Sequence, residues 1–160
     1  MGLLLEQNLL SMEIERKFLV DKVLWALQAK PEGQKIKQAY LVNSPEKTIR
    51  VRTKGTKGFL TIKGPTVGIS RAEYEYEIPV HEAEELIQQF AVQYIEKIRY
   101  EITVGKHLWE VDEFYGKHAG LMLAEIELTA EDELFEYPEW ITIEVSHDTS
   151  YFNSNLITKK

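Results

Sequence analysis

The sequence predicts an α+β fold built on a closed, eight-stranded antiparallel β-barrel, a tunnel with a polar, charged lumen and helices packed outside it. Three observations predict this fold. Most of the chain alternates polar and apolar residues with period two. Short turn-forming segments separate the alternating runs, as in hairpins. Charged side chains gather on one face of these runs, and closure into a barrel would turn that face inward and remove exposed sheet edges.

The composition indicates one globular domain. The chain has 160 residues, of which 44% are hydrophobic and 28% charged. We expect the domain over residues 12–160, preceded at 1–11 by an N-terminal extension that is disordered or non-native. The lack of cysteine excludes disulfides and thiolate zinc sites, and it agrees with a cytoplasmic protein. A net charge of −7 and the lack of a membrane-length apolar run argue against nucleic-acid and membrane partners.

The predicted elements follow one another with few interruptions. The strands are expected at Met12–Val20, Lys35–Asn43, Lys47–Lys54, Gly58–Gly64, Ser70–Val80, Tyr94–Val104, His107–Tyr115 and Leu121–Leu128. Helices are expected at Asp21–Gln28, where Asp21 is a plausible N-cap, at His81–Ala91, which carries one apolar stripe, and at Thr149–Leu156. The three tryptophans are expected to pack between barrel and helices, and the four histidines, which lack ligand spacing, are expected at the surface or in loops.

The charges are sorted by strand. In "MEIERKFLV" the residues Glu13, Glu15 and Lys17 share one face, while Ile14 and Phe18 share the other. Later strands carry either carboxylates or cations in the same alternation. A half-solvated sandwich would explain any single strand. A solvated surface, however, tends to intersperse the two signs, so the collective pattern favours a charged lumen.

A lumen rich in both signs needs charged contents, because buried charges require partners. Arginines at alternating strand positions offer forked donors suited to phosphate oxygens. Carboxylates are hard oxygen ligands that suit Mg²⁺ or Mn²⁺. Cationic walls with a carboxylate-bound divalent metal are what phosphoryl transfer requires. Arg16, on the apolar face of its strand, has no explanation at this level.

An ordered set of motifs carries a family resemblance. The motifs are "EIERK" at 13–17, "KQAYL" at 37–41, "IRVR" at 49–52, "LTIKG" at 60–64, "RAEYEYEIP" at 71–79, "EKIRY" at 96–100, "WEVDEF" at 109–114 and "AEIEL" at 124–128. From Met12 to about Leu156 the chain resembles the CYTH superfamily, the triphosphate tunnel metalloenzymes. The resemblance implies an eight-stranded tunnel, a triphosphate substrate and Mg²⁺ or Mn²⁺ as cofactor.

The resemblance also implies residue roles. The implied metal ligands are Glu13, Glu15, Asp112, Glu125 and Glu127. The implied phosphate-binding cations are Lys17, Arg50, Arg52, Lys63, Lys97 and Arg99. Glu73 and Glu75 are implied accessory acidic residues, with Glu77 and Glu110 less defined. Tyr40 and Lys97 are the candidates for positioning or deprotonating the attacking water.

"QAYL" and "YFNSNL" at 151–156 resemble the short bacterial branch that hydrolyses tripolyphosphate, in which the terminal helix closes one tunnel end. The expected activity is therefore metal-dependent hydrolysis of inorganic tripolyphosphate to pyrophosphate and phosphate. A nucleoside triphosphatase, a thiamine triphosphatase and a class IV-type adenylyl cyclase are alternatives that share the tunnel. A non-catalytic polyphosphate or nucleotide sensor is the alternative from another class. The expected partner is a small-molecule triphosphate, and a homodimer is a reasonable assembly.

Overall fold

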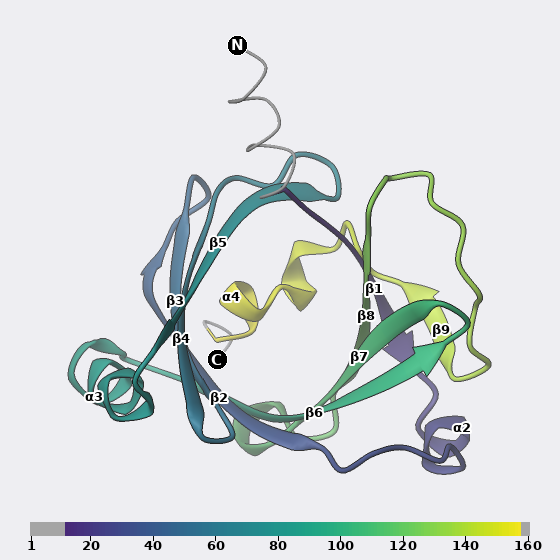
Figure 1. The fold of residues 1–160 in the computed structure, drawn as a ribbon, viewed down its shortest axis with the longest axis horizontal. Helices are drawn as coiled ribbons and strands as arrows, with labels where there is room; N and C mark the ends of the chain where they lie inside the picture. The colour runs from purple at the N-terminus through teal and green to yellow at the C-terminus, as the bar shows by residue number, and fades with distance from the viewer. Residues whose placement is uncertain (1–11, 158–160) are drawn as a thin grey trace.

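The chain folds into a closed antiparallel β-barrel in a computed structural model that describes residues 12–157 (Figure 1). Its strands are β1 (Met12–Val20), β2 (Gln34–Asn43), β3 (Thr48–Lys54), β4 (Lys57–Lys63), β5 (Ser70–Ile78), β6 (Ile95–Val104), β7 (His107–Phe114) and β8 (Met122–Leu128). They are ordered β5-β4-β3-β2-β6-β7-β8-β1, and an antiparallel β1–β5 pairing closes the barrel. The predicted barrel is confirmed. The expected extension at 1–11 lies outside the described residues.

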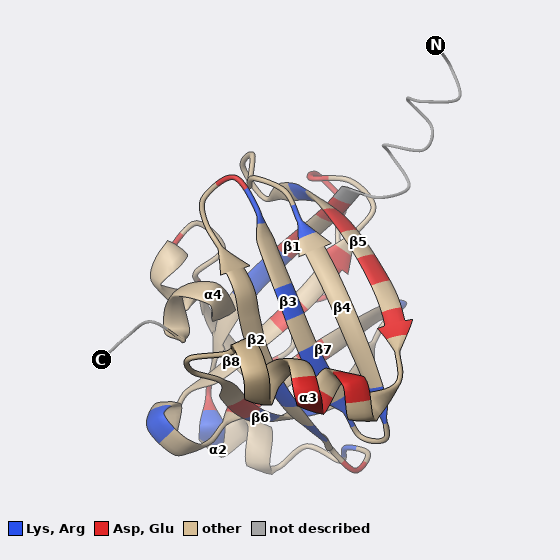
Figure 2. Ribbon diagram, turned by 90° about the vertical axis from the view of Figure 1, so that its left-hand side faces the viewer, with Lys and Arg blue, Asp and Glu red and all other residues tan. Residues whose placement is uncertain are grey.

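The strand registers place the charged positions on the inner face. On the β1–β8 seam Glu15 lies opposite Glu127 and Lys17 lies opposite Glu125. Figure 2 shows basic bands along β3 and a run of acidic bands along β5, with β4 between them. The sorting of charge by strand in the sequence therefore becomes a sorting by wall in the barrel. Within residues 12–157 no helix is long and apolar enough to cross a bilayer.

One outer face of the barrel is covered by helix α3 (Val80–Phe90), as its apolar stripe predicted. Ala83 and Ile87 of α3 pack with Ala39 of β2 and Val51 of β3. All four side chains are buried, so this layer forms a compact core outside the sheet. Figure 1 shows α3 beside β3 and β4, away from the lumen.

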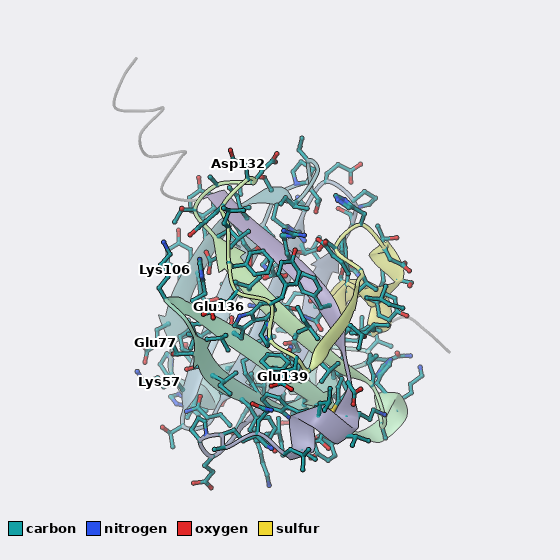
Figure 3. All side chains as sticks on the ribbon, turned by 90° about the vertical axis from the view of Figure 1, so that its right-hand side faces the viewer. Lys57, Glu77, Lys106, Asp132, Glu136 and Glu139 are labelled. Carbon is teal, nitrogen blue, oxygen red and sulfur yellow. The ribbon has the colours of Figure 1, made fainter. Side chains whose placement is uncertain are left out.

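An aromatic core covers the opposite outer face. The helix α2 (Lys22–Ala26) is capped by Asp21, whose Oδ1 accepts hydrogen bonds from the backbone N–H groups of Val23 and Leu24. Its Trp25 packs edge-on against Trp140, and Trp140 packs against Trp109 of β7. The segment 129–140 runs down the outside of the barrel from Asp132 to Glu139 (Figure 3). The predicted packing role of the three tryptophans is confirmed.

His107 departs from the prediction. The sequence placed all four histidines at the surface or in loops, but His107 is only 9% exposed. Its Nε2 lies 2.9 Å from Glu133 Oε1, and the same carboxylate accepts from the Thr129 hydroxyl at 2.9 Å. His107 therefore anchors the segment that carries the aromatic core. The prediction failed because Glu133 lies 26 residues further along the chain, outside any local spacing rule.

A ninth strand, β9 (Ile141–Glu144), pairs with β1 and was not predicted. It accounts for Arg16, which projects outward from β1. Arg16 Nε donates to Glu144 Oε1 at 2.8 Å, and its guanidinium lies 5.0 Å from the centre of the Phe135 ring. A cation on this apolar face is stabilised by one carboxylate and by the faces of the Phe135 and Phe18 rings.

The C-terminal segment closes one end of the barrel. A 3₁₀ turn, η2 (Thr149–Tyr151), is followed by the short helix α4 (Asn153–Leu156), and a second 3₁₀ turn, η1 (Gly116–His118), joins β7 to β8. Leu156 packs with Ile95, Phe114 and Leu123 at the end of the lumen. The predicted helix at Thr149–Leu156 is thus present in two pieces, because Phe152 adopts extended backbone angles between them.

Candidate active site

The barrel encloses a cavity of about 250 Å³ whose wall is charged. Most of the predicted site residues line it: Glu13, Glu15, Lys17, Tyr40, Arg50, Arg52, Lys63, Glu73, Glu75, Arg99, Glu125 and Glu127. Glu110, which the sequence left less defined, lines it as well. Two predicted site residues, Lys97 and Asp112, do not. The structure therefore gathers side chains from distant strands into one polar chamber.

The arginines of β3 form a cationic wall that is held by one carboxylate of β5. Arg52 Nη2 donates to both carboxylate oxygens of Glu75 at 3.2 and 3.3 Å, and Arg50 Nη2 lies 3.6 Å from Glu75. The Thr61 hydroxyl donates to Glu75 at 3.0 Å. Burial raises the pKa of Glu75, but Arg52 and Thr61 lower it more, so the carboxylate stays charged.

The carboxylates of β1 and β8 form the facing wall. Glu13 lies 2.8 Å from Lys63 Nζ, and Glu125 lies 3.2 Å from Lys17 Nζ. Burial and the charges of Glu125 and Glu13 raise the pKa of Glu15 well above its ordinary value. Glu13, Glu15 and Glu125 therefore lie close enough on one side of the chamber to interact electrostatically.

The fit of this wall to a divalent metal rests on its donor chemistry. Within residues 12–157 no three acidic or histidine side chains are already arranged around a single metal position. The wall does present several hard oxygen donors to one cavity, and burial together with repulsion from Glu125 and Glu13 raises the pKa of Glu15. A cation among these carboxylates would relieve that repulsion, so the residues suit Mg²⁺ or Mn²⁺.

Lys97 and Asp112 form a buried ion pair behind the wall. Lys97 Nζ lies 2.7 Å from Asp112 Oδ2, and Arg99 donates to the two Asp112 oxygens at 2.7 and 2.8 Å. Burial lowers the pKa of Lys97 to about 8 despite the attraction of Asp112. Arg99 also donates to Glu110 at 2.6 Å, which connects the buried pair to the cavity. The metal-ligand role of Asp112 and the catalytic role of Lys97 stay predictions.

The comparison with protein families decides the assignment of this barrel. The CYTH domain model matches residues 11–159. The chain belongs to the CYTH family. Inorganic triphosphatase from Acetivibrio thermocellus is 47% identical over 91% of this CYTH chain and 92% of its own length. Inorganic triphosphatase from Nitrosomonas europaea is 37% identical over 90% and 95%. The crystal structure of the inorganic triphosphatase NE1496 matches with a TM-score of 0.64 and 34% identity, over 92% of this chain and 95% of that one.

The C-terminal segment of this CYTH domain also contributes to the cavity. Phe152, Asn153 and Ser154 line it. Lys17 Nζ donates to the backbone oxygen of Tyr151 at 3.2 Å and lies 5.6 Å from the centre of the Phe152 ring. The sequence pointed to this segment only through its resemblance to the family branch. No periodicity marked it, because its residues meet the site through the tertiary fold.

Arg71 is a cationic residue of the cavity that sequence reasoning missed. It lines the chamber and donates from Nη2 to the Thr48 hydroxyl at 3.3 Å. The signal was present, because Arg71 shares the parity of Glu73 and Glu75 on β5. It was overlooked because the acidic run of that strand dominated its interpretation.

Proposed function

We propose that this CYTH protein hydrolyses inorganic tripolyphosphate to pyrophosphate and phosphate inside its barrel, with Mg²⁺ or Mn²⁺ as cofactor. The observation that carries the proposal is the chamber of about 250 Å³, inside the barrel, in which arginines of β3 face carboxylates of β1 and β8. Inorganic triphosphatases at 47% and 37% identity over nine-tenths of the chain support the choice of substrate.

The cations of the chamber are proposed to bind the phosphate chain. Arg50, Arg52, Arg71 and Arg99 present forked donors, and Lys17 and Lys63 present point charges, all toward one cavity. Several of them are paired with carboxylates in the structure, as Lys63 is with Glu13. Phosphate oxygens would replace or share these carboxylate partners. The cations are already removed from bulk water, so substrate binding adds little cost for desolvating them.

The carboxylates of the facing wall are proposed to hold the metal. Glu13, Glu15, Glu125 and Glu127 line the cavity and are its hard oxygen donors on β1 and β8. A bound Mg²⁺ or Mn²⁺ supplies charge neutralisation and polarisation of phosphate oxygens. Asp112, with Lys97 and Arg99 on its oxygens, is proposed to complete this set from behind the wall.

Tyr40 is proposed to position the attacking water from the cavity wall. Lys97, which does not line the cavity, is the second candidate for this role. Tyr40 lines the cavity from β2, directly opposite Arg50 in the strand register. Its hydroxyl therefore belongs to the same chamber as the phosphate-binding arginines. Proton transfer by a positioned side chain typically contributes a factor of about 10²–10⁴ to the rate.

A metal-by-substrate screen with product analysis tests the proposal. Tripolyphosphate, ATP and thiamine triphosphate are each incubated with the protein in Mg²⁺, Mn²⁺ or EDTA. The expected result is metal-dependent release of pyrophosphate and phosphate from tripolyphosphate at the highest rate. Cyclic AMP with pyrophosphate from ATP would instead show a cyclase. Tight binding of tripolyphosphate with no product under any metal would show a sensor.

A further inference from the structure

Gln38 of β2 is a buried amide with no partner in the chain. Its side chain is completely buried and shares the inward face of the strand with Ile36 and Tyr40. Neither Oε1 nor Nε2 hydrogen-bonds to any group within residues 12–157. Buried amides are nearly always hydrogen-bonded, so an amide placed here needs a use that packing does not supply. A leucine would fill the same space without that need.

The strand register identifies what lies next to Gln38. Arg52 of β3 is directly opposite on one side, and Ile95 of β6 is directly opposite on the other. Directly opposite residues have Cβ atoms about 5 Å apart, within reach of two long side chains. Gln38 is therefore the cross-strand neighbour of Arg52, which lines the cavity, but Gln38 does not line the cavity itself.

Arg52 is held at only one end of its guanidinium. Its Nη2 donates to Glu75, and its guanidinium carbon lies 5.2 Å from the centre of the Phe59 ring. Its Nε is buried and, within the described part of the chain, donates to nothing. The buried donor of Arg52 and the buried acceptor of Gln38 thus occupy paired positions on neighbouring strands.

We infer that Gln38 is a positioning residue for Arg52: a buried water accepts the hydrogen bond that Arg52 Nε–H donates, and this water in turn donates to Gln38 Oε1. A buried water typically makes about three hydrogen bonds. Here Arg52 Nε–H offers it a donor and Gln38 Oε1 offers it an acceptor. Fixing Nε leaves the Nη atoms aimed at the cavity when phosphate oxygens compete with Glu75. This inference rests on the proposed function, since it assigns Arg52 to the phosphate chain.

A double-mutant cycle with Gln38→Leu and Arg52→Lys tests the inference, because lysine has no Nε–H donor at this position. The binding of sodium tripolyphosphate in EDTA is measured by calorimetry, and kcat and KM are measured in Mn²⁺. Gln38→Leu alone is expected to weaken binding and lower kcat/KM about tenfold. In the Arg52→Lys background the same change is expected to cost less than about twofold.

Thermal unfolding separates positioning from packing. Gln38→Leu and Gln38→Met remove the amide at nearly constant volume and leave the buried water and Arg52 Nε with one partner fewer, so the Tm is expected to fall slightly together with the loss of binding. The matched control is Ile36→Val, two residues away on the same inward face, which is expected to lower the Tm and leave kcat/KM unchanged. Rescue of tripolyphosphate affinity is not expected from Gln38→Met, which lacks the amide.

Equal losses from Gln38→Leu in both Arg52 backgrounds would overturn the inference, as would a lowered Tm with unchanged binding. Binding and turnover of tripolyphosphate by the wild-type protein test the proposed function separately. Binding without turnover would overturn the hydrolase proposal while the cycle in binding still decides the role of Gln38. A wild-type protein that neither binds nor hydrolyses tripolyphosphate would overturn both.

Discussion

Of the two catalytic candidates, Tyr40 lines the chamber and Lys97 does not. The Tyr40 side chain also packs against the apolar cluster at the closed end of the barrel. Tyr40→Phe keeps the ring and removes the hydroxyl. The kcat for tripolyphosphate is expected to fall about 100-fold with little change in Tm. Steady-state kinetics check this, and an unchanged kcat would remove Tyr40 from the mechanism.

Arg16 gives a prediction about stability. Arg16→Met removes the contacts with Glu144 and Phe135 and is expected to lower the free energy of unfolding by about 1 kcal/mol. The control Lys57→Met removes an exposed lysine 3.9 Å from Glu77 and is expected to change stability by less than about 0.5 kcal/mol. Urea unfolding at pH 7 measures both variants. Equal stability of wild type and Arg16→Met would contradict the account.

The same pair predicts a pH dependence. The hydrogen bond from Arg16 lowers the pKa of Glu144 below its ordinary value of 4.5. As the pH falls below 4.5, the unfolded chain takes up a proton at Glu144 before the folded chain does. The stabilisation is therefore present above this pH and is lost as the pH falls through the lowered pKa. The difference in unfolding free energy between wild type and Arg16→Met is expected to shrink in that range.

The sequence was enough to predict which side chains face the lumen, but not which of these side chains contact each other. Alternation along β1 and β3 was enough to place Glu13, Glu15 and Arg52 in the lumen. The Glu13–Lys63 contact joins residues fifty positions apart and depends on closure of β1 against β5. Lys97 shares the parity of the lining residues but lies behind the wall, because depth in a barrel is not encoded by alternation.

At the scale of elements, the terminal segment yields a prediction about packing. Leu156 of α4 is 2% exposed among Ile95, Phe114 and Leu123, so Leu156→Ala leaves a cavity at the closed end. The free energy of unfolding is expected to fall by about 2–5 kcal/mol. The control Leu134→Ala removes a side chain that is 88% exposed and is expected to have less than about 0.5 kcal/mol effect. Equal losses of unfolding free energy from Leu156→Ala and Leu134→Ala in chemical denaturation would contradict the assignment of α4 as the element that closes this end of the barrel.

The long elements and the short helix α2 with its Asp21 cap were predictable, whereas the short strand β9 was not. Eight strands and the helix α3 carry enough residues for a repeated pattern, and their predicted bounds match the structure closely. The strand β9 has four residues, too few to separate alternation from a loop. Its place is fixed by pairing with β1 and by Arg16, and both are tertiary contacts.

For the whole molecule, barrel closure explains how an acidic chain gathers six cations into one chamber. The net charge is −7, yet six arginine and lysine side chains line one cavity. Closure through the β1–β5 pairing brings the carboxylates of β1 within reach of Lys63 on β4. The function therefore depends on the closed architecture, and no single strand carries it.

The carboxylates of β1 and β8 are proposed to support metal-dependent triphosphate hydrolysis in the chamber. The most direct test is the rate of phosphate release from tripolyphosphate in Mn²⁺ by Glu15→Gln, with Tm as the check on folding. The control is Glu77→Gln, an acidic position of β5 that does not line the cavity. Glu15→Gln is expected to lose about a thousandfold or more of the rate with an unchanged Tm, and Glu77→Gln is expected to keep full activity. Full metal-dependent turnover by a folded Glu15→Gln protein would contradict it.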